Sequence, residues 1–288
     1  MERTMHQKAI RKDNPTARKV LHAVIYILLV GLAVFTLIPF VWMISSSLKL
    51  DREVFSYPMH WIPETFRWEN YVLIWQKVPL VTYFKNTAFI AVVVTFLQTL
   101  TSSFAAYAFA KLEFRGRDTL FLCYIATIAV PWQAYMLPQF IMMRSMGLYD
   151  TLWAMVVLQA FSAFGVFLMR QFYRGIPTDL CEAARLDGLS EYGIWSRIML
   201  PLSTAAIATL VIFTFVGTWN DYMGPMIYLT RDYNKTIQVG LRRFIQENSS
   251  DYHLIMAASL CSLLPVSVVF LFLQKYFIEG IATSGLKG

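Results

Sequence analysis

The chain has 288 residues, of which 57% are hydrophobic and only 15% are charged, and its formal net charge is +7. A soluble globular domain carries about 25% charged residues. With a mean hydropathy of +0.50, this shortage of charge argues against a disordered chain, a coiled coil and a nucleic-acid-binding protein. The composition predicts an integral membrane protein that lies in a lipid bilayer.

Six apolar stretches are long enough to cross a bilayer. A helix needs about 20 apolar residues to span a hydrocarbon core about 30 Å thick, because each residue rises about 1.5 Å. An ion buried in lipid is costly, and these stretches lack Asp, Glu, Lys and Arg except for Asp221 and Lys275 at the ends of the last two. We therefore predict an all-α protein with six transmembrane helices. They lie near residues 21–43, 86–110, 119–143, 151–169, 202–222 and 254–275.

The distribution of basic residues predicts the orientation of the chain. Placing the N-terminus in the cytoplasm leaves 15 of the 25 Lys and Arg residues on the inner side, as the positive-inside rule requires. We therefore predict a basic cytoplasmic tail over residues 1–20, a six-helix domain over 21–279 and a cytoplasmic C-terminal tail over 280–288. Both termini would lie on the same side of the membrane.

Prolines interrupt several of these stretches. A proline inside a helix removes one backbone hydrogen bond and clashes with the preceding turn. Pro39, Pro131, Pro138 and Pro265 can therefore kink their helices. Membrane helices also tolerate proline without a functional reason, and both interpretations stay open.

Residues 170–201, between the fourth and fifth spans, are too long for a simple turn and too polar to enter lipid. Asp179 followed by Glu182 resembles a capping box, and Gly188 can end the helix in a left-handed conformation. Ser190 can then cap a second helix. The sequence predicts two short helices joined by a turn on the cytoplasmic surface.

The second helix of this loop is expected to pack on the membrane-embedded part of the chain. Its apolar residues are Tyr192, Ile194, Trp195, Ile198 and Met199. Pro201 is expected to begin the next span, where a missing N–H costs nothing.

The loop also carries a motif. Glu182-Ala183-Ala184, then Gly188, then Ile198, Leu200 and Pro201 reproduce the pattern E-A-A-x3-G-x9-I-x-L-P. This pattern resembles the loop that marks the permease subunits of bacterial ABC importers. The segment 217–222 and the chain end 285–288 are similar to those of carbohydrate-import permeases related to the smaller permease of the maltose transporter.

The resemblance implies a function for the loop. In that family a short coupling helix docks into a groove of an ATPase subunit, and its glutamate pairs with a basic residue there. The residues expected to couple to the ATPase are Glu182, Ala183, Ala184, Asp187, Gly188, Ile198, Leu200 and Pro201. This chain lacks a phosphate-binding G-x-x-x-x-G-K-[ST] motif, so we expect it to be no enzyme and to hold no cofactor.

The resemblance also implies an assembly in the bacterial cytoplasmic membrane. The expected partners are a second, homologous permease, an ABC ATPase dimer that binds ATP and Mg, and an extracytoplasmic binding protein that delivers a sugar or oligosaccharide. A metal site is not expected, since the four His and three Cys residues form no cluster in the sequence. A nucleic-acid partner is not expected either, because the Lys and Arg residues are spread over loops and a tail.

Polar and aromatic residues inside the spans are candidates for the solute path. They are Gln133, Tyr135, Gln159, Trp219 and Asn220, with Gln98 and Gln139 beside them. Amides and aromatic rings suit a neutral polyol, but amides also join membrane helices by hydrogen bonds, and both interpretations stay open. The alternative function, an ion-coupled secondary transporter, would need ionisable residues near mid-bilayer.

Overall fold

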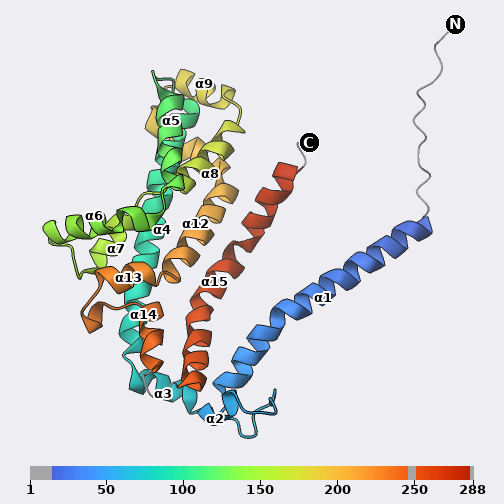
Figure 1. Cartoon of the computed structure of the whole chain (residues 1–288). Helices are drawn as coiled ribbons and strands as arrows, with labels where there is room; N and C mark the ends of the chain where they lie inside the picture. The colour runs from blue at the N-terminus through green and yellow to red at the C-terminus, as the bar shows by residue number, and fades with distance from the viewer. Residues whose placement is uncertain (1–14, 246–250, 286–288) are drawn as a thin grey trace.

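The computed structural model describes the backbone of residues 15–245 and 251–285 and the side chains of residues 19–245 and 251–276. These residues form helices without a β-strand (Figure 1), so the predicted all-α fold is confirmed. The α-helices are α1 Pro15–Ser47, α2 Asp51–Val54, α3 Asn70–Lys77, α4 Leu80–Lys111, α5 Arg117–Ala126, α6 Trp132–Ser145, α7 Leu152–Gln159, α8 Ala163–Arg174, α9 Asp179–Leu186, α10 Glu191–Ile194, α11 Leu200–Leu202, α12 Thr204–Trp219, α13 Met223–Tyr228, α14 Ile237–Leu241 and α15 Tyr252–Gly285. Trp195–Met199 is a π-helix, and Thr127–Ala129, Asp232–Asn234 and Arg242–Phe244 are single 3₁₀ turns.

Three of the helices are by themselves long and apolar enough to cross a membrane. They lie within α1, α4 and α15, at Lys19–Ser47, Leu80–Lys111 and Tyr252–Tyr276. The third and fourth predicted spans instead correspond to pairs of helices, bent by 98° between α5 and α6 and by 42° between α7 and α8. The fifth predicted span corresponds to α12, which follows the segment Glu191–Leu202 of the predicted cytoplasmic loop after a bend of 81°. Counting each bent pair as one span gives up to six among the described residues.

The sharpest of these bends lies at Pro131. Val130 has φ −84° and ψ 114°, and Pro131 continues the extended backbone with φ −65° and ψ 137°. A proline disfavours helical geometry in the residue before it, so the predicted kink is here a complete break. Pro39, Pro138 and Pro265 lie inside continuous helices.

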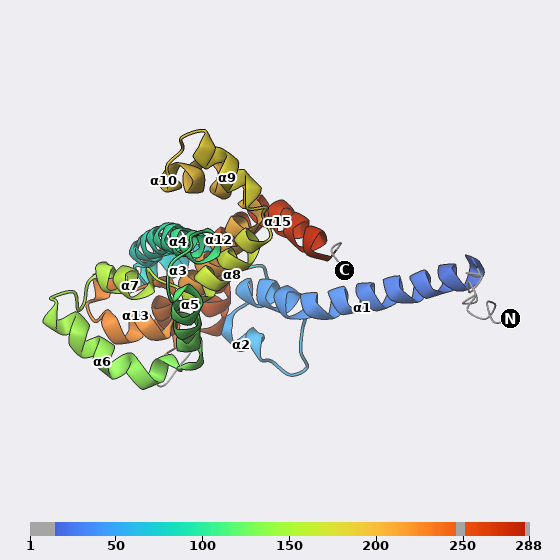
Figure 2. The same cartoon turned by 90° about the horizontal axis from the view of Figure 1, so that it is seen from above.

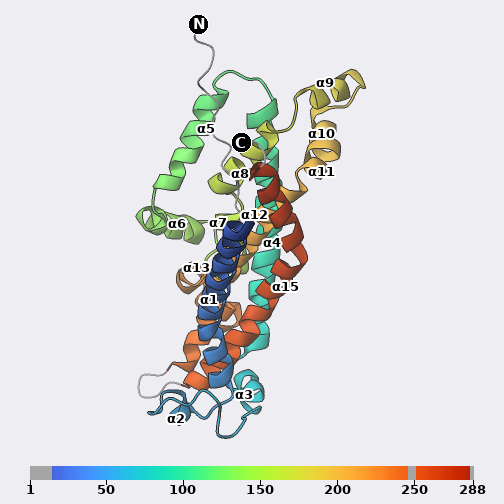
Figure 3. The ribbon, with the colours of Figure 1, turned by 90° about the vertical axis from the view of Figure 1, so that its right-hand side faces the viewer.

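Helix α4 is the central element. It packs against α8 and α12, and Figure 3 shows it running from the level of α3 to the level of α9. Its buried residues contribute to three separate hydrophobic cores, through Ala106 and Tyr107 at one end, Ile90 and Val94 in the middle, and Tyr83 near its start. The packing of the other helices therefore depends on this one.

Helix α1 leaves the bundle. It packs against α15, and Figures 1 and 2 show the rest of the helix projecting away from the other elements. None of the residues in its most apolar window is buried. A helix that is apolar on all sides is typical of a membrane span.

The predicted tails fall only partly on described residues. Residues 15–20 of the predicted basic tail belong to α1, and residues 280–285 of the predicted C-terminal tail belong to α15. Residues 1–14 and 286–288 lie outside the described residues.

The contact between α4 and α8 predicts an effect of mutation. A Cβ at Gly165 would overlap the hydroxyl of Ser102 and lie 3.0 Å from its Cβ. Gly165→Ala should destabilise the fold by about 1–3 kcal/mol through overpacking, measured as a lower thermal midpoint of the detergent-purified chain by tryptophan fluorescence. Gly217→Ala, with nothing within 4 Å of the added Cβ, is the control and should not lower the midpoint. Equal losses in both variants would contradict this packing.

Candidate functional site

The predicted cytoplasmic loop forms a hairpin, defined here as residues 178–202. It contains α9, a turn, α10, the π-helix and α11, and it projects from one end of the bundle (Figures 2 and 3). The prediction that Pro201 begins the fifth span is wrong. Pro201 lies in α11, and α12 begins at Thr204 after the 81° bend.

The turn of the hairpin follows the sequence prediction closely. Gly188 has φ +82°, a conformation that costs L-residues about 1–2 kcal/mol. Its N–H donates to the carbonyl of Arg185 at 3.0 Å, and the N–H of Leu189 donates to the carbonyl of Ala184 at 2.9 Å. This pair of bonds is the Schellman motif, which satisfies the last carbonyls of a helix.

The N-cap of α10 was predicted correctly, and the N-cap of α9 was not. Ser190 caps α10 as expected, because its Oγ accepts from the N–H of Gly193 at 3.2 Å. Asp179 is not the N-cap of α9: the cap is Thr178, without a side-chain hydrogen bond. Asp179 and Glu182 instead lie in the first turn, where a carboxylate interacts favourably with the helix dipole.

The two alanines of the motif have different environments. Ala184 is buried beside Cys181 in the core under the hairpin, and burial raises the pKa of the Cys181 thiol. Ala183 is exposed, as are Glu182 and Leu186, which is 90% exposed. The small side chain of Ala184 therefore serves packing within this chain. The outward face of α9, as the term is used here, is Glu182, Ala183 and Leu186; Asp179, Leu180 and Arg185 of the same helix are exposed as well. Asp187 is also exposed.

The second helix is held mainly by apolar contacts. Ile194, Trp195 and Met199 are buried as predicted, and Ile198 and Leu200 are partly buried against the same core. The prediction that Tyr192 packs inward is wrong, since it is 65% exposed. Its ring lies 5.3 Å from that of Trp195, so it covers the edge of the core.

A polar link joins the hairpin to α4. Arg185 donates to Glu191 through Nε at 2.6 Å and Nη2 at 3.3 Å, and Tyr107 Oη donates to Glu191 Oε2 at 2.5 Å. The hydrogen bond to Glu191 raises the pKa of Arg185. Lys111 Nζ adds a bond of 2.6 Å to the carbonyl of Ile176. Sequence reasoning missed this link because its two ends lie 84 residues apart.

A polar cavity of about 240 Å³ lies between α6, α7 and the start of α13. Two of the predicted solute-path residues, Tyr135 and Gln159, line it, and so does Gln139. Trp132, Asp221 and Tyr228 also line it and were not among the residues predicted from the sequence. The cavity therefore combines aromatic rings, amides and one carboxylate.

A chain of hydrogen bonds connects this cavity to α4 and α12. Gln98 Nε2 donates to the carbonyl of Gln159 at 2.9 Å, and Thr214 donates to Gln98 Oε1 at 2.5 Å. Gln159 in turn donates to Asp221 at 2.9 Å and accepts from Thr218 at 3.0 Å. Gln98 and Gln159 thus join helices, the interpretation left open beside solute binding.

The other solute-path candidates do not line this cavity. Gln133 is exposed on α6. Trp219 is buried and donates to the carbonyl of Ser262 on α15 at 3.0 Å. Asn220 is exposed and accepts from Gln238 at 3.1 Å.

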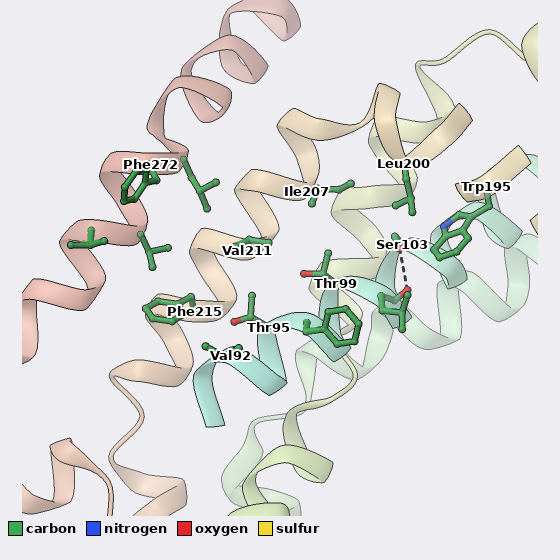
Figure 4. A pocket seen from close by; sticks show the side chains of 15 residues that line it. Val92, Thr95, Thr99, Ser103, Trp195, Leu200, Ile207, Val211, Phe215 and Phe272 are labelled. Atoms are coloured by element: carbon green, nitrogen blue, oxygen red, sulfur yellow. Dashed lines mark hydrogen bonds between the residues drawn. The ribbon is translucent and has the colours of Figure 1, made fainter. Parts of the chain in front are cut away.

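A second, larger space of about 640 Å³ is an apolar groove. Figure 4 shows side chains of α4, α12 and α15 pointing towards it, among them Val92, Val211 and Phe272. The hydroxyls of Thr95 and Thr99 have no hydrogen-bond partner among the described residues. This lining offers little to a sugar, which needs several polar partners.

An aspartate fixes the loop that follows α13, next to the polar cavity. Asp150 has φ +58°, and its carboxylate accepts from the N–H groups of Thr230 and Arg231 at 2.8 and 3.0 Å. Burial opposes ionisation of Asp150, but these N–H groups, Asn234 and the Arg231 guanidinium lower its pKa below the usual value. The turn before α7 is therefore tied to the loop after α13.

No group of three His, Cys, Asp or Glu residues in the described part of the chain has the arrangement of a metal site.

Comparison with known proteins gives the family. The description "Binding-protein-dependent transport system inner membrane component" matches residues 98–283. The chain belongs to this family. The match and the apolar helices identify it as a multi-pass protein of the plasma membrane and a permease of the ABC transporter class.

The chain is similar to permeases of comparable length. It is 33% identical over 227 residues to the arabinooligosaccharides transport system permease protein AraQ of Halalkalibacterium halodurans, covering 78% of this chain and 81% of AraQ. It is 33% identical over 255 residues to the melibiose/raffinose/stachyose import permease protein MelC of Bacillus subtilis, covering 87% and 91%.

A solved structure shares the fold. It is a chain of a bacterial ABC transporter involved in the import of the acidic polysaccharide alginate, with a TM-score of 0.80 and 26% identity. The match covers 91% of this chain and 98% of that one.

The left-handed turn at Gly188 predicts a local effect. Gly188→Ala meets no neighbour within 4 Å, but its φ of +82° is strained for alanine. Hydrogen–deuterium exchange at residues 184–190 should accelerate about tenfold, because the local opening free energy falls by about 1–2 kcal/mol. Gly193→Ala, whose Cβ would make an ordinary 3.5 Å contact with Ser190 Oγ, should leave that exchange unchanged. Unchanged exchange in Gly188→Ala would contradict the assigned turn.

Proposed function

We propose that this chain is one of two permease subunits of an ATP-driven importer for a sugar or oligosaccharide. The family is dependent on a binding protein by its description, and both similar permeases are named for oligosaccharide transport. A second, homologous permease forms the other half of the path, and an extracytoplasmic binding protein delivers the solute. ATP and Mg bind to a separate ATPase dimer.

The observation that carries the proposal is the outward face of α9. Glu182, Ala183 and Leu186 form an exposed acidic and apolar surface on α9, opposite Cys181 and Ala184, which are buried against the chain's own core. A small residue between an exposed carboxylate and an exposed leucine allows close approach of a partner surface. The ATPase docks on this face, with Glu182 paired to a basic residue. Gly188, Ile198, Leu200 and Pro201 set the position of the face.

The topology follows from this assignment. A hairpin that docks on an ATPase lies in the cytoplasm. The six spans are then α1, α4, the bent pair α5 and α6, the bent pair α7 and α8, α12, and α15. Both termini then lie in the cytoplasm, in accord with the excess of Lys and Arg on that side.

The polar cavity is a candidate part of the solute path. Its lining includes Trp132, Tyr135, Gln139, Gln159 and Asp221. This set suits a polyol, since rings pack on apolar sugar faces and amide and carboxylate groups bond to hydroxyls. The sugar itself is to be identified by uptake assays with the complete importer.

Charge reversal on α9 tests the docking face. Glu182→Arg should abolish co-purification of the ATPase with this chain from native membranes in mild detergent, measured by mass spectrometry of the eluate. The variant should still insert, because an exposed side chain contributes little to stability. Sugar uptake should fall with docking.

The matched control is Glu113→Arg, the same charge reversal at an exposed residue of the loop between α4 and α5. It should retain the ATPase and transport. Uptake at the normal rate by Glu182→Arg would overturn the docking assignment. If the wild-type chain elutes without any ATPase, even after cross-linking, the importer proposal itself fails and ion-coupled transport becomes the better hypothesis.

A further inference from the structure

One face of α4 receives the hairpin. Phe104, Tyr107 and Lys111 are spaced by three and four residues, so they lie on the same side of the helix. Phe104 makes an edge contact with Trp195, with ring centroids 5.4 Å apart. Tyr107 bonds to Glu191, and Lys111 bonds to the backbone just before α9.

Glu191 connects three elements. It begins α10, accepts two hydrogen bonds from Arg185 of α9, and accepts a third from Tyr107 of α4. Tyr107 is only 2% exposed, so its hydroxyl has a fixed position. Hydrogen bonds to a carboxylate are short and directional. This arrangement fixes the angle of α9 relative to α4, whereas apolar contacts alone tolerate sliding.

The same helix reaches the polar cavity. Gln98 lies nine residues before Tyr107 on α4, a rise of about 14 Å. Its side chain bonds to the backbone of Gln159, whose own side chain bonds to Asp221 in the cavity lining. A continuous series of contacts therefore runs from the outward face of α9 through Glu191 and α4 to the cavity, and a displacement of α9 can be transmitted along it.

We propose that Glu191 is a positioning residue that, held by Arg185 and Tyr107, makes the docking hairpin and α4 move as one body. The inference rests on the proposed function, because α9 is taken as the docking helix. Stability of the hairpin comes from its buried apolar side chains, Ile194, Trp195 and Met199 among them. The polar link instead sets how much of the ATPase motion reaches the solute path.

Spin-label distances test the link directly. Labels at Leu186→Cys on α9 and Phe96→Cys on α4, both exposed positions, are placed in the full chain in detergent after replacement of the exposed Cys123. The parent chain should give a narrow distance distribution. Tyr107→Phe and Glu191→Gln should each broaden it about twofold, and the two changes together should broaden it no further, because they break the same link.

The control is Tyr192→Phe, which removes a hydroxyl from an exposed tyrosine next to Glu191 and should leave the distribution narrow. Thermal midpoints of all variants establish that they are folded. Narrow distributions in both Tyr107→Phe and Glu191→Gln would overturn the inference.

A second measurement distinguishes a role of Glu191 in positioning the hairpin from a role in stability alone. In vesicles containing the complete importer, Tyr107→Phe should still hydrolyse ATP but take up about tenfold less sugar per ATP, as expected for loss of one hydrogen bond to a charged group. Radiolabelled raffinose and arabinotriose are the probes. An unchanged uptake per ATP would overturn the inference. If neither sugar enters wild-type vesicles, the proposed substrate class is in error, and the distance distributions still decide the positioning role.

Discussion

Helix α4 packs against α8 and α12, and its last two turns support the hairpin that carries α9. The approach to α8 is close because Gly165 lies against Ser102. Small residues at such contacts let membrane helices meet without a hydrophobic driving force. Two polar groups on α4 then bond to different elements, Gln98 to Gln159 of α7 and Tyr107 to Glu191 of α10. The candidate docking face and the candidate solute cavity are thereby attached to one helix of 32 residues.

The two alanines of the E-A-A motif are small for different reasons, which the sequence alone does not distinguish. Ala184 faces the core of its own chain and must be small for α9 to lie close to it. Ala183 faces outward between Glu182 and Leu186, where a small side chain leaves room for a partner. Under the proposed function the motif serves both packing within this chain and docking of a partner, and substitutions at its two alanines are expected to differ in their consequences.

Local signals were predictable from the sequence and long-range ones were not. The apolar stretches, the left-handed turn at Gly188 and the cap at Ser190 depend on neighbouring residues, and all three are present. The bend before Thr204 was not predicted, because a continuous apolar stretch carries no signal for its direction. The N-cap of α9 is Thr178 and not the predicted Asp179. The hydrogen bond from Tyr107 to Glu191 was not predicted because it joins residues remote in sequence. Of the solute-path candidates, Tyr135 and Gln159 meet at the cavity, whereas Trp219 serves helix packing.

Photo-cross-linking in native membranes tests most directly whether the outward face of α9 contacts an ATPase. A photoreactive amino acid replaces Leu186 on that face, and in a separate sample it replaces Leu122, an exposed residue of α5. Our account predicts a cross-link from position 186 to a cytoplasmic ATP-binding subunit, and none to that subunit from position 122. Cross-links from position 186 to lipid alone would contradict it, because they would place the hairpin on the membrane surface without a partner.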